Sequence, residues 1–274
     1  MMTFLFLLLL LPLLFLVAAI VGAFFEARRS PYPFAMGRVI SNSFAAIGGA
    51  PLPLFAASAL LNAPAQLLMP LFAPNAYDAD RLVEAGSSVA PLGMLGLLLY
   101  PPVMVFMAGL AVDTLAGRPV DPAATLRMAL RRFLPALAMF LLFGIAVFAG
   151  MVLFFLPAIF VILTWFVVVP VMAAEGRGAL ECFSRSSQLM RGMRWRLLLL
   201  LVIVGLLWLV VSLLVQGPIV LLLGAGGGWT ASVIRAVFAT LLGVLPATGT
   251  AAVYHEIRTA KEGSGTHDLE TVFA

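Results

Sequence analysis

Residues 175–196, EGRGALECFSRSSQLMRGMRWR, form the longest polar run between two apolar blocks of the chain. The apolar block before the run ends at Ala174, and the next one begins at Leu197. Five arginines lie within it: Arg177, Arg185, Arg191, Arg194 and Arg196. Apolar blocks joined by short basic connectors are typical of a protein that crosses a membrane several times.

Composition supports the same interpretation. The chain has 274 residues, of which 63% are hydrophobic and only 10% charged. Soluble domains average roughly 45–50% apolar and 25% charged residues. Lipid must therefore be the solvent for most of the apolar surface, and one membrane domain is expected. The net charge of +4 is assigned to membrane-flanking arginines rather than to nucleic-acid binding, because no nucleic-acid-binding signature is present.

The apolar segments predict an all-α, polytopic transmembrane helical bundle of about seven spans. The expected spans are Met1–Phe25, Ala45–Phe72, Val89–Val112, Phe133–Phe155, Ala158–Ala174, Leu197–Leu223 and Ala231–Tyr254. We divide the chain into an extra N-terminal transmembrane helix (1–25), a helical bundle (37–262) and a flexible cytoplasmic tail (263–274). Translation from Met36 is the alternative, and it would remove the first span.

Prolines are expected to interrupt two of these spans. Pro51, Pro53 and Pro64 should kink or divide the second span, and Pro101–Pro102 should disrupt the third. Arg235 is expected to snorkel from the outer end of the last span.

The positive charges predict the orientation. With the N-terminus outside and the C-terminus inside, only Arg81 and Arg235 fall outside. The inside group is Arg28, Arg29, Arg38, Arg118, Arg127, Arg131, Arg132, Arg177, Arg185, Arg191, Arg194, Arg196, Arg258 and Lys261. Cytoplasmic loops carry this excess of arginine and lysine.

Amphipathic interfacial helices are expected on the cytoplasmic side. In a helix over Ala179–Met193, one face would carry Ala179, Cys182, Phe183, Ser186, Met190 and Met193. The arginines lie off that face, so the five arginines of the central run are candidate ligands for anionic lipid headgroups. A second short helix should follow Asp121, a suitable N-cap with Pro122 after it, and should carry Arg127, Arg131 and Arg132 toward the headgroups.

Few polar side chains lie inside the expected spans. The candidates for an intramembrane polar site are Asn62, Gln66, Tyr100 and Thr164. Asn62 and Gln66 share one helix face, and hydrogen bonding that holds helices together is the favoured explanation for them.

Two stretches resemble a known family. The first is PVMAAEGRGALECFSRSSQLMRGMRWRLL after the fifth span, and the second is AAVYHEIRTAKEG followed by DLE after the last span. Together with GRVISNSFAAIGG near the start, they resemble the glycerophosphodiester phosphodiesterase membrane-domain family and its uncharacterised bacterial inner-membrane relatives. The matching positions are Pro170, Glu175, Gly178, Arg185, Ser186, Leu189, Gly192, Trp195, Arg196, Tyr254, Glu256, Arg258, Lys261, Glu262, Gly263, Asp268, Leu269 and Glu270.

This resemblance implies a bundle of about six spans in a bacterial inner membrane. The sequence departs from the family pattern at His255, at the SGTH insertion before Asp268 and in the extra segment Met1–Phe25. The phosphodiesterase name implies no activity here, because it comes from relatives that carry a separate catalytic barrel.

The chain shows no catalytic motif. His255 begins an HExxH-like HEIRT, but the second histidine is missing, and Cys182 is the single cysteine. We therefore expect no enzyme activity, no cofactor and no metal site. Glu175 is expected to form an ion pair with Arg177 or Arg258.

The leading hypothesis is a non-enzymatic membrane scaffold or accessory subunit. Its basic inner face would bind anionic phospholipid headgroups, and a partner protein could bind to the same face. The alternative is a transporter or flippase-like component for a lipid-like substrate, and a weaker third is an enzyme acting on lipid phosphates.

Overall fold

The computed structural model describes residues 16–28, 34–72, 82–153, 156–223 and 228–263. In these ranges the chain is helical apart from short connections, which confirms the predicted all-α class. Residues 16–28 form a helix, while the rest of the expected first span and most of the expected tail lie outside the described residues. The remaining helices are α2 (Met36–Gly49), α3 (Pro51–Phe72), α4 (Leu82–Leu115), α5 (Pro122–Arg131), α6 (Phe133–Val152), α7 (Leu156–Thr164), α8 (Val168–Glu175), α9 (Ala179–Met190), α10 (Arg194–Leu223), α11 (Gly228–Gly243) and α12 (Leu245–Glu262).

Six stretches of helix in the described residues are long and apolar enough to cross a membrane. They are Pro51–Leu68, Gly93–Leu115, Phe133–Val152, Leu156–Glu175, Arg194–Leu223 and Gly228–Glu262. Their surfaces agree with this: Leu52, Leu134 and Leu221 are 81%, 76% and 85% exposed. Soluble monomers rarely expose such contiguous apolar surface. The six helices indicate a multi-pass membrane protein.

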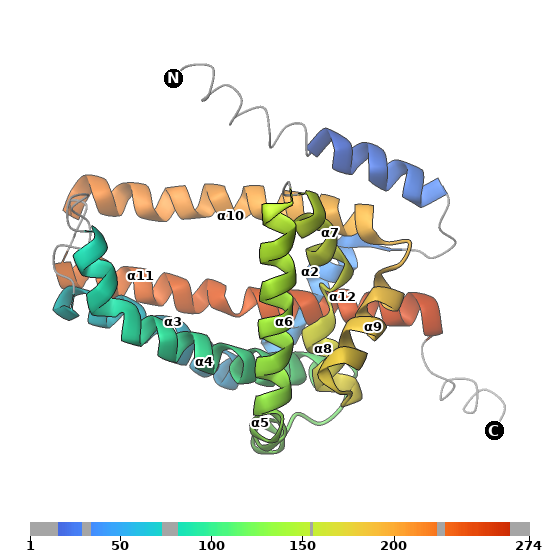
Figure 1. The fold of residues 1–274 in the computed structure, drawn as a ribbon, viewed down its shortest axis with the longest axis horizontal. Helices are drawn as coiled ribbons and strands as arrows, with labels where there is room; N and C mark the ends of the chain where they lie inside the picture. Colours follow the sequence, from blue (N-terminus) through green and yellow to red (C-terminus); the bar gives the residue numbers. More distant parts are fainter. Residues whose placement is uncertain (1–15, 29–33, 73–81, 154–155, 224–227, 264–274) are drawn as a thin grey trace.

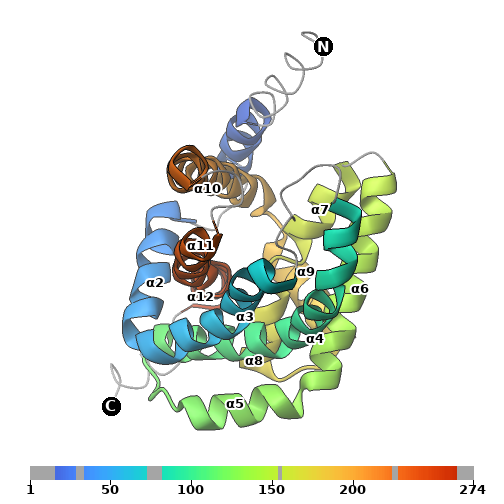
Figure 2. The same cartoon turned by 90° about the vertical axis from the view of Figure 1, so that its left-hand side faces the viewer.

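The helices run in two directions rather than one. Figure 1 shows α10, α11 and α12 lying along the long axis of the molecule, while α6 and α7 cross that direction. In Figure 2 the first group is seen end-on, and α6 again runs across it. The helices therefore form a bundle in which the long axes are not all parallel.

The core forms around the C-terminal half of α4. Residues Met104–Val112 are all buried, and α4 contacts α2, α3, α5, α6, α8 and α12. Ala247, Ala251 and Ala252 of α12 are fully buried, so small side chains face the neighbours of that helix. Small residues let helices approach closely, which is how apolar helices associate without a hydrophobic driving force between them.

The second expected span is divided at Pro51 as predicted, because α2 ends at Gly49 and α3 begins at Pro51, but the other prolines do not break their helices. α4 continues through Pro101 and Pro102, and α3 continues through Pro64. Pro51 is the first residue of α3, where a missing N–H costs no helical hydrogen bond. Transmembrane helices tolerate such prolines because neighbouring helices and local backbone adjustments satisfy the freed carbonyl groups.

Two expected spans are instead interrupted at other places. The fifth is divided at residues 165–167 into α7 and α8, and the last at Val244 into α11 and α12. Val168 N donates to Trp165 O rather than continuing the α-helical pattern, and Ser186 Oγ donates to Thr164 O at 3.1 Å. At the second interruption, Ser58 Oγ donates to Thr240 O at 2.7 Å. A serine from a neighbouring helix thus satisfies a carbonyl at each helix end.

Arg235 is placed differently from the prediction. It is 7% exposed and donates through Nε to Gln216 Oε1 at 3.2 Å, which joins α11 to α10. The half-buried side chain of Gln216 on the neighbouring helix accepts this hydrogen bond, and the guanidinium lies inside the protein instead of at the outer surface.

Candidate functional site

The predicted amphipathic helix of the central polar run is present as α9, but it ends at Met190 rather than at Met193. Cys182, Phe183, Ser186 and Met190 are buried, while Gln188 is exposed. The helix packs on α8, α6 and α12, so its apolar face is covered by protein. Burial raises the pKa of the Cys182 thiol to about 11.

The turn before α9 depends on Gly176. This residue ends α8 with a φ of 69°, a left-handed conformation that glycine adopts without strain. A Cβ at this position would lie 2.5 Å from a terminal nitrogen of Arg132. Arg132 in turn donates to Met172 O at 2.7 Å, one of the carbonyl groups left free at the end of α8.

Glu175 is the centre of an ion-pair network that joins α8, α9 and α12. It accepts hydrogen bonds from Arg177 Nε at 2.7 Å, from Arg185 Nε at 3.0 Å and from the Tyr254 hydroxyl at 3.1 Å. Its side chain is only 11% exposed. The predicted pair of Glu175 with Arg177 is present, whereas Arg258 pairs with Glu262 at 3.2 Å.

Arg185 links Glu175 to the end of α12. It forms ion pairs with both Glu175 and Glu262. Burial lowers the pKa of the Arg185 guanidinium, but its hydrogen bonds to Glu262 and Glu175 outweigh that effect, and the pKa is raised. Lys261 Nζ adds a further contact, because it donates to the carbonyl groups of Gln188 and Arg191 at the end of α9.

A second carboxylate, Glu256, holds α12 against α2. It is 4% exposed and accepts from Arg38 at 2.7 Å and from the backbone N–H of Ala35 at 3.1 Å. The hydrogen bond and charge of Glu256 raise the pKa of Arg38. The two buried carboxylates of this region are therefore both paired with arginine.

The five arginines predicted to bind headgroups have different environments. Arg177 and Arg185 are paired with carboxylates, and Arg194 stacks over the Phe160 ring at 4.4 Å. Arg196 is 8% exposed, and its backbone N–H donates to Glu26 at 3.0 Å. Arg191 is exposed. The structure thus gathers Arg177 and Arg185 in one network and places the other three apart from it.

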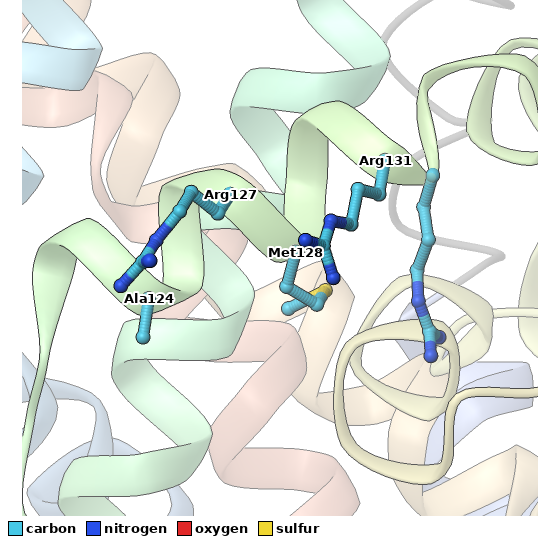
Figure 3. Close-up of a pocket in the computed structure, with 5 residues that line it drawn as sticks. Ala124, Arg127, Met128 and Arg131 are labelled. Carbon is cyan, nitrogen blue, oxygen red and sulfur yellow. The ribbon is translucent and has the colours of Figure 1, made fainter.

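A second basic surface lies on α5. Asp121 caps this helix as predicted, because its side chain accepts from the backbone N–H groups of Ala123 and Ala124 at 2.9 and 3.1 Å. A hollow of about 360 Å³ is lined by Ala124, Arg127, Met128, Arg131 and Arg132. Figure 3 shows Arg127 and Arg131 extending from the same helix, Arg127 toward Ala124 and Arg131 toward Met128. Among the described residues, no carboxylate forms an ion pair with Arg127 or Arg131.

The sequence predicts that α5 carries Arg127, Arg131 and Arg132 toward the headgroups. It indicates headgroup binding more strongly for the arginine-rich run 175–196. The sequence alone does not show which of the two groups of arginines has carboxylate partners, because one partner of Arg185 is Glu262, 77 residues away.

The predicted intramembrane polar residues do not form one site. Asn62 donates to Ser58 O of its own helix at 2.9 Å and lies against Gly243, where an added Cβ would be 2.5 Å from its nitrogen. Tyr100 packs edge-on against Phe140 at 5.4 Å, and Thr164 lies at the end of α7. Gln66 is half-buried on α3. Ser58, whose hydroxyl bonds to Thr240 O of α11, was not among the predicted intramembrane residues.

The described residues contain no group of three or more His, Cys, Asp or Glu side chains arranged to hold a metal ion. No protein-family model, no curated protein and no solved structure matches the chain.

Proposed function

We propose that the chain is a non-enzymatic integral membrane protein of a bacterial inner membrane. Its basic cytoplasmic face binds anionic phospholipid headgroups, and it serves as a scaffold or accessory subunit with room for a partner protein. The observation that carries this proposal is the exposed arginine pair on α5, Arg127 and Arg131, without a carboxylate partner in the described part of the chain.

The position of these two arginines favours an anionic ligand. They are four residues apart, so they lie on one helix face, where like charges repel each other. A phosphate between them would remove that repulsion and accept hydrogen bonds from both guanidinium groups. The hollow of about 360 Å³ beside them leaves room for a phosphate group.

The apolar side chains of α5 favour a membrane surface as the source of the phosphate. Leu126 and Leu130 are 46% and 58% exposed on the same short helix. A helix that exposes both leucines and arginines suits the boundary between headgroups and acyl chains. The non-enzymatic part of the proposal is supported by Glu175 and Glu256, because arginine hydrogen bonds occupy both carboxylates.

The test compares lipid retention by the full chain and by Arg127→Gln/Arg131→Gln. Each protein is placed in nanodiscs of phosphatidylcholine with a minor fraction of phosphatidylglycerol, and retained lipid is measured by native mass spectrometry. Because each arginine near an anionic surface contributes about 1 kcal/mol, the double variant should bind phosphatidylglycerol roughly 30-fold more weakly.

Arg118→Gln is the matched control. Arg118 is 52% exposed and close in sequence, but it is already paired with Asp113 at 2.6 Å. It should leave retention unchanged. Equal retention of phosphatidylglycerol by the α5 double variant and the unaltered chain would refute the proposal.

A further inference from the structure

An apolar cavity lies where α4, α6, the α7–α8 junction and α12 meet. Its volume is about 220 Å³. Aromatic rings form much of its wall, including Tyr100, Phe140, Phe143 and Trp165. Tyr100 and Phe140 pack edge-to-face with ring centroids 5.4 Å apart. Phe143 and Trp165 lie 6.4 Å apart.

Both interrupted helices reach this cavity. Trp165 and Phe166 belong to the non-helical segment between α7 and α8, and Pro246 and Thr250 belong to the first turns of α12, just after the interruption at Val244. Irregular backbone within a span is tolerated where it is buried in protein or lines a cavity. The convergence of two such interruptions on one cavity distinguishes it from an ordinary gap between continuous helices.

The chemistry of the wall selects an uncharged, apolar occupant. Tyr100 is the one lining residue with an ionisable side chain. The Thr250 hydroxyl donates to Pro246 O at 2.9 Å and Ala247 O at 3.0 Å, within its own helix. A charged or strongly polar ligand would lose its hydration without gaining a charged partner from the wall.

The size of the cavity suits part of a hydrocarbon chain. Apolar cavities of about 150 Å³ bind benzene-sized molecules and exclude water. At about 220 Å³ this cavity is larger, yet it is below the usual range of roughly 300–1,000 Å³ for sites that enclose a whole drug-sized ligand. Because the helices that form it are candidate membrane spans, acyl chains are the hydrocarbon that surrounds it.

We propose that this cavity binds the terminal segment of an acyl chain from a membrane phospholipid. The site is separate from the arginines of α5, and the proposal does not depend on headgroup charge. The protein would then bind an acyl chain inside this cavity, in addition to the lipid that covers its outer surface.

The experiment uses Trp165 as a probe within the cavity wall. A variant in which Trp195, Trp208 and Trp229 are replaced by phenylalanine retains Trp165 alone. Purified in detergent, it is titrated with phosphatidylcholine that carries bromine atoms near the end of one acyl chain. Bromine quenches tryptophan fluorescence on contact, so quenching reports a chain within the cavity.

A second variant that retains only Trp208 is the surface reference, because Trp208 is 44% exposed on α10. Quenching of Trp165 should saturate at about one lipid per protein. Quenching of Trp208 should increase steadily with the amount of brominated lipid. If Trp165 also shows no saturation, or if it is not quenched, the proposal is wrong.

Filling the cavity tests the location of the chain. The exchange Thr250→Leu is made in the variant that retains Trp165 alone. It adds apolar volume to the cavity wall and should displace about two methylene groups of the bound acyl chain. Since each buried methylene changes affinity about fourfold, binding should weaken roughly 15-fold. Thr230→Leu is the matched control, since Thr230 is exposed on α11.

Thr250→Ala also removes the hydroxyl but makes the side chain smaller, so saturable quenching of Trp165 should remain. The comparison shows whether filling of the cavity or loss of the hydroxyl weakens binding. Equal affinities for the Thr250→Leu and Thr230→Leu variants would overturn the assignment. The Arg127→Gln/Arg131→Gln exchange should leave quenching of Trp165 unchanged, so failure of the headgroup proposal and failure of this one are distinguishable.

Discussion

Replacing Glu175 by glutamine is expected to weaken the attachment of α8 to α9 and α12. The carboxylate accepts hydrogen bonds from Arg177, Arg185 and Tyr254, and these donors belong to the α8–α9 turn, α9 and α12. Glutamine keeps the size of the side chain but removes the negative charge and one of the two good acceptors. The variant therefore leaves Arg185 with Glu262 as its remaining carboxylate partner.

The expected magnitude follows from the exposure of each donor. Arg185 is 20% exposed, so its hydrogen bond to a charged acceptor contributes about 1.5–3 kcal/mol. Arg177 is 46% exposed, and solvent limits its ion pair to at most about 1 kcal/mol. The Tyr254 hydroxyl adds about 1 kcal/mol. Because the amide oxygen of glutamine retains one acceptor, the net loss of unfolding free energy should be about 3 kcal/mol.

The assay is reversible unfolding in mixed micelles, in which helix content is followed as the fraction of denaturing detergent increases. Glu181→Gln is the control, because Glu181 is exposed on α9 and has no ion pair among the described residues. It should change the unfolding free energy by less than about 0.5 kcal/mol. If Glu175→Gln unfolds at the same detergent fraction as Glu181→Gln, the reasoning about the network is refuted.

Two further predictions concern packing and thiol chemistry. Gly243→Ala should destabilise the fold by about 1–3 kcal/mol, because the new Cβ would lie 2.4 Å from Ser58 Oγ and 2.5 Å from Asn62 Nδ2. In the same unfolding assay Gly205→Ala should be neutral or stabilising, since nothing lies within 4 Å of that Cβ, and equal losses for the two variants would contradict the packing argument. Cys182, whose pKa is raised to about 11, should remain a protonated thiol at pH 8 and react with maleimide far more slowly in the folded chain than after denaturation. The rate in the folded chain should increase as the pH approaches 11, and rapid labelling at pH 8 would show that the thiol is accessible and ionised.

Local features of the fold follow directly from the sequence. The spacing of Cys182, Phe183, Ser186 and Met190 predicted the buried face of α9, and the structure confirms it. The Asp121–Pro122 pair predicted the start of α5, with the hydrogen bonds that an N-cap requires. These predictions succeed because helical periodicity and capping depend on residues within a few positions of each other.

The division of the second expected span at Pro51 was predicted from its prolines, but the interruptions of the fifth and last expected spans could not be predicted in this way. Proline content pointed to Pro101–Pro102, yet α4 continues there, and a helix is instead interrupted at residues 165–167. The carbonyl at that interruption is satisfied by Ser186, 22 residues away. Whether a break is tolerated depends on a partner from another helix, and hydropathy along one segment contains no information about that partner.

The sequence by itself determined the solvent of this protein and the approximate positions of its long apolar segments. An apolar fraction of 63% and apolar blocks long enough to span a bilayer require lipid, whatever the packing. Only the tertiary structure decided which arginines remain available to a ligand. Arg185 is neutralised by carboxylates from α8 and α12, whereas Arg131 on α5 has no such partner among the described residues. The physical reason is that charge pairing acts over a few ångströms in space, and residues 77 positions apart become neighbours only when the helices pack.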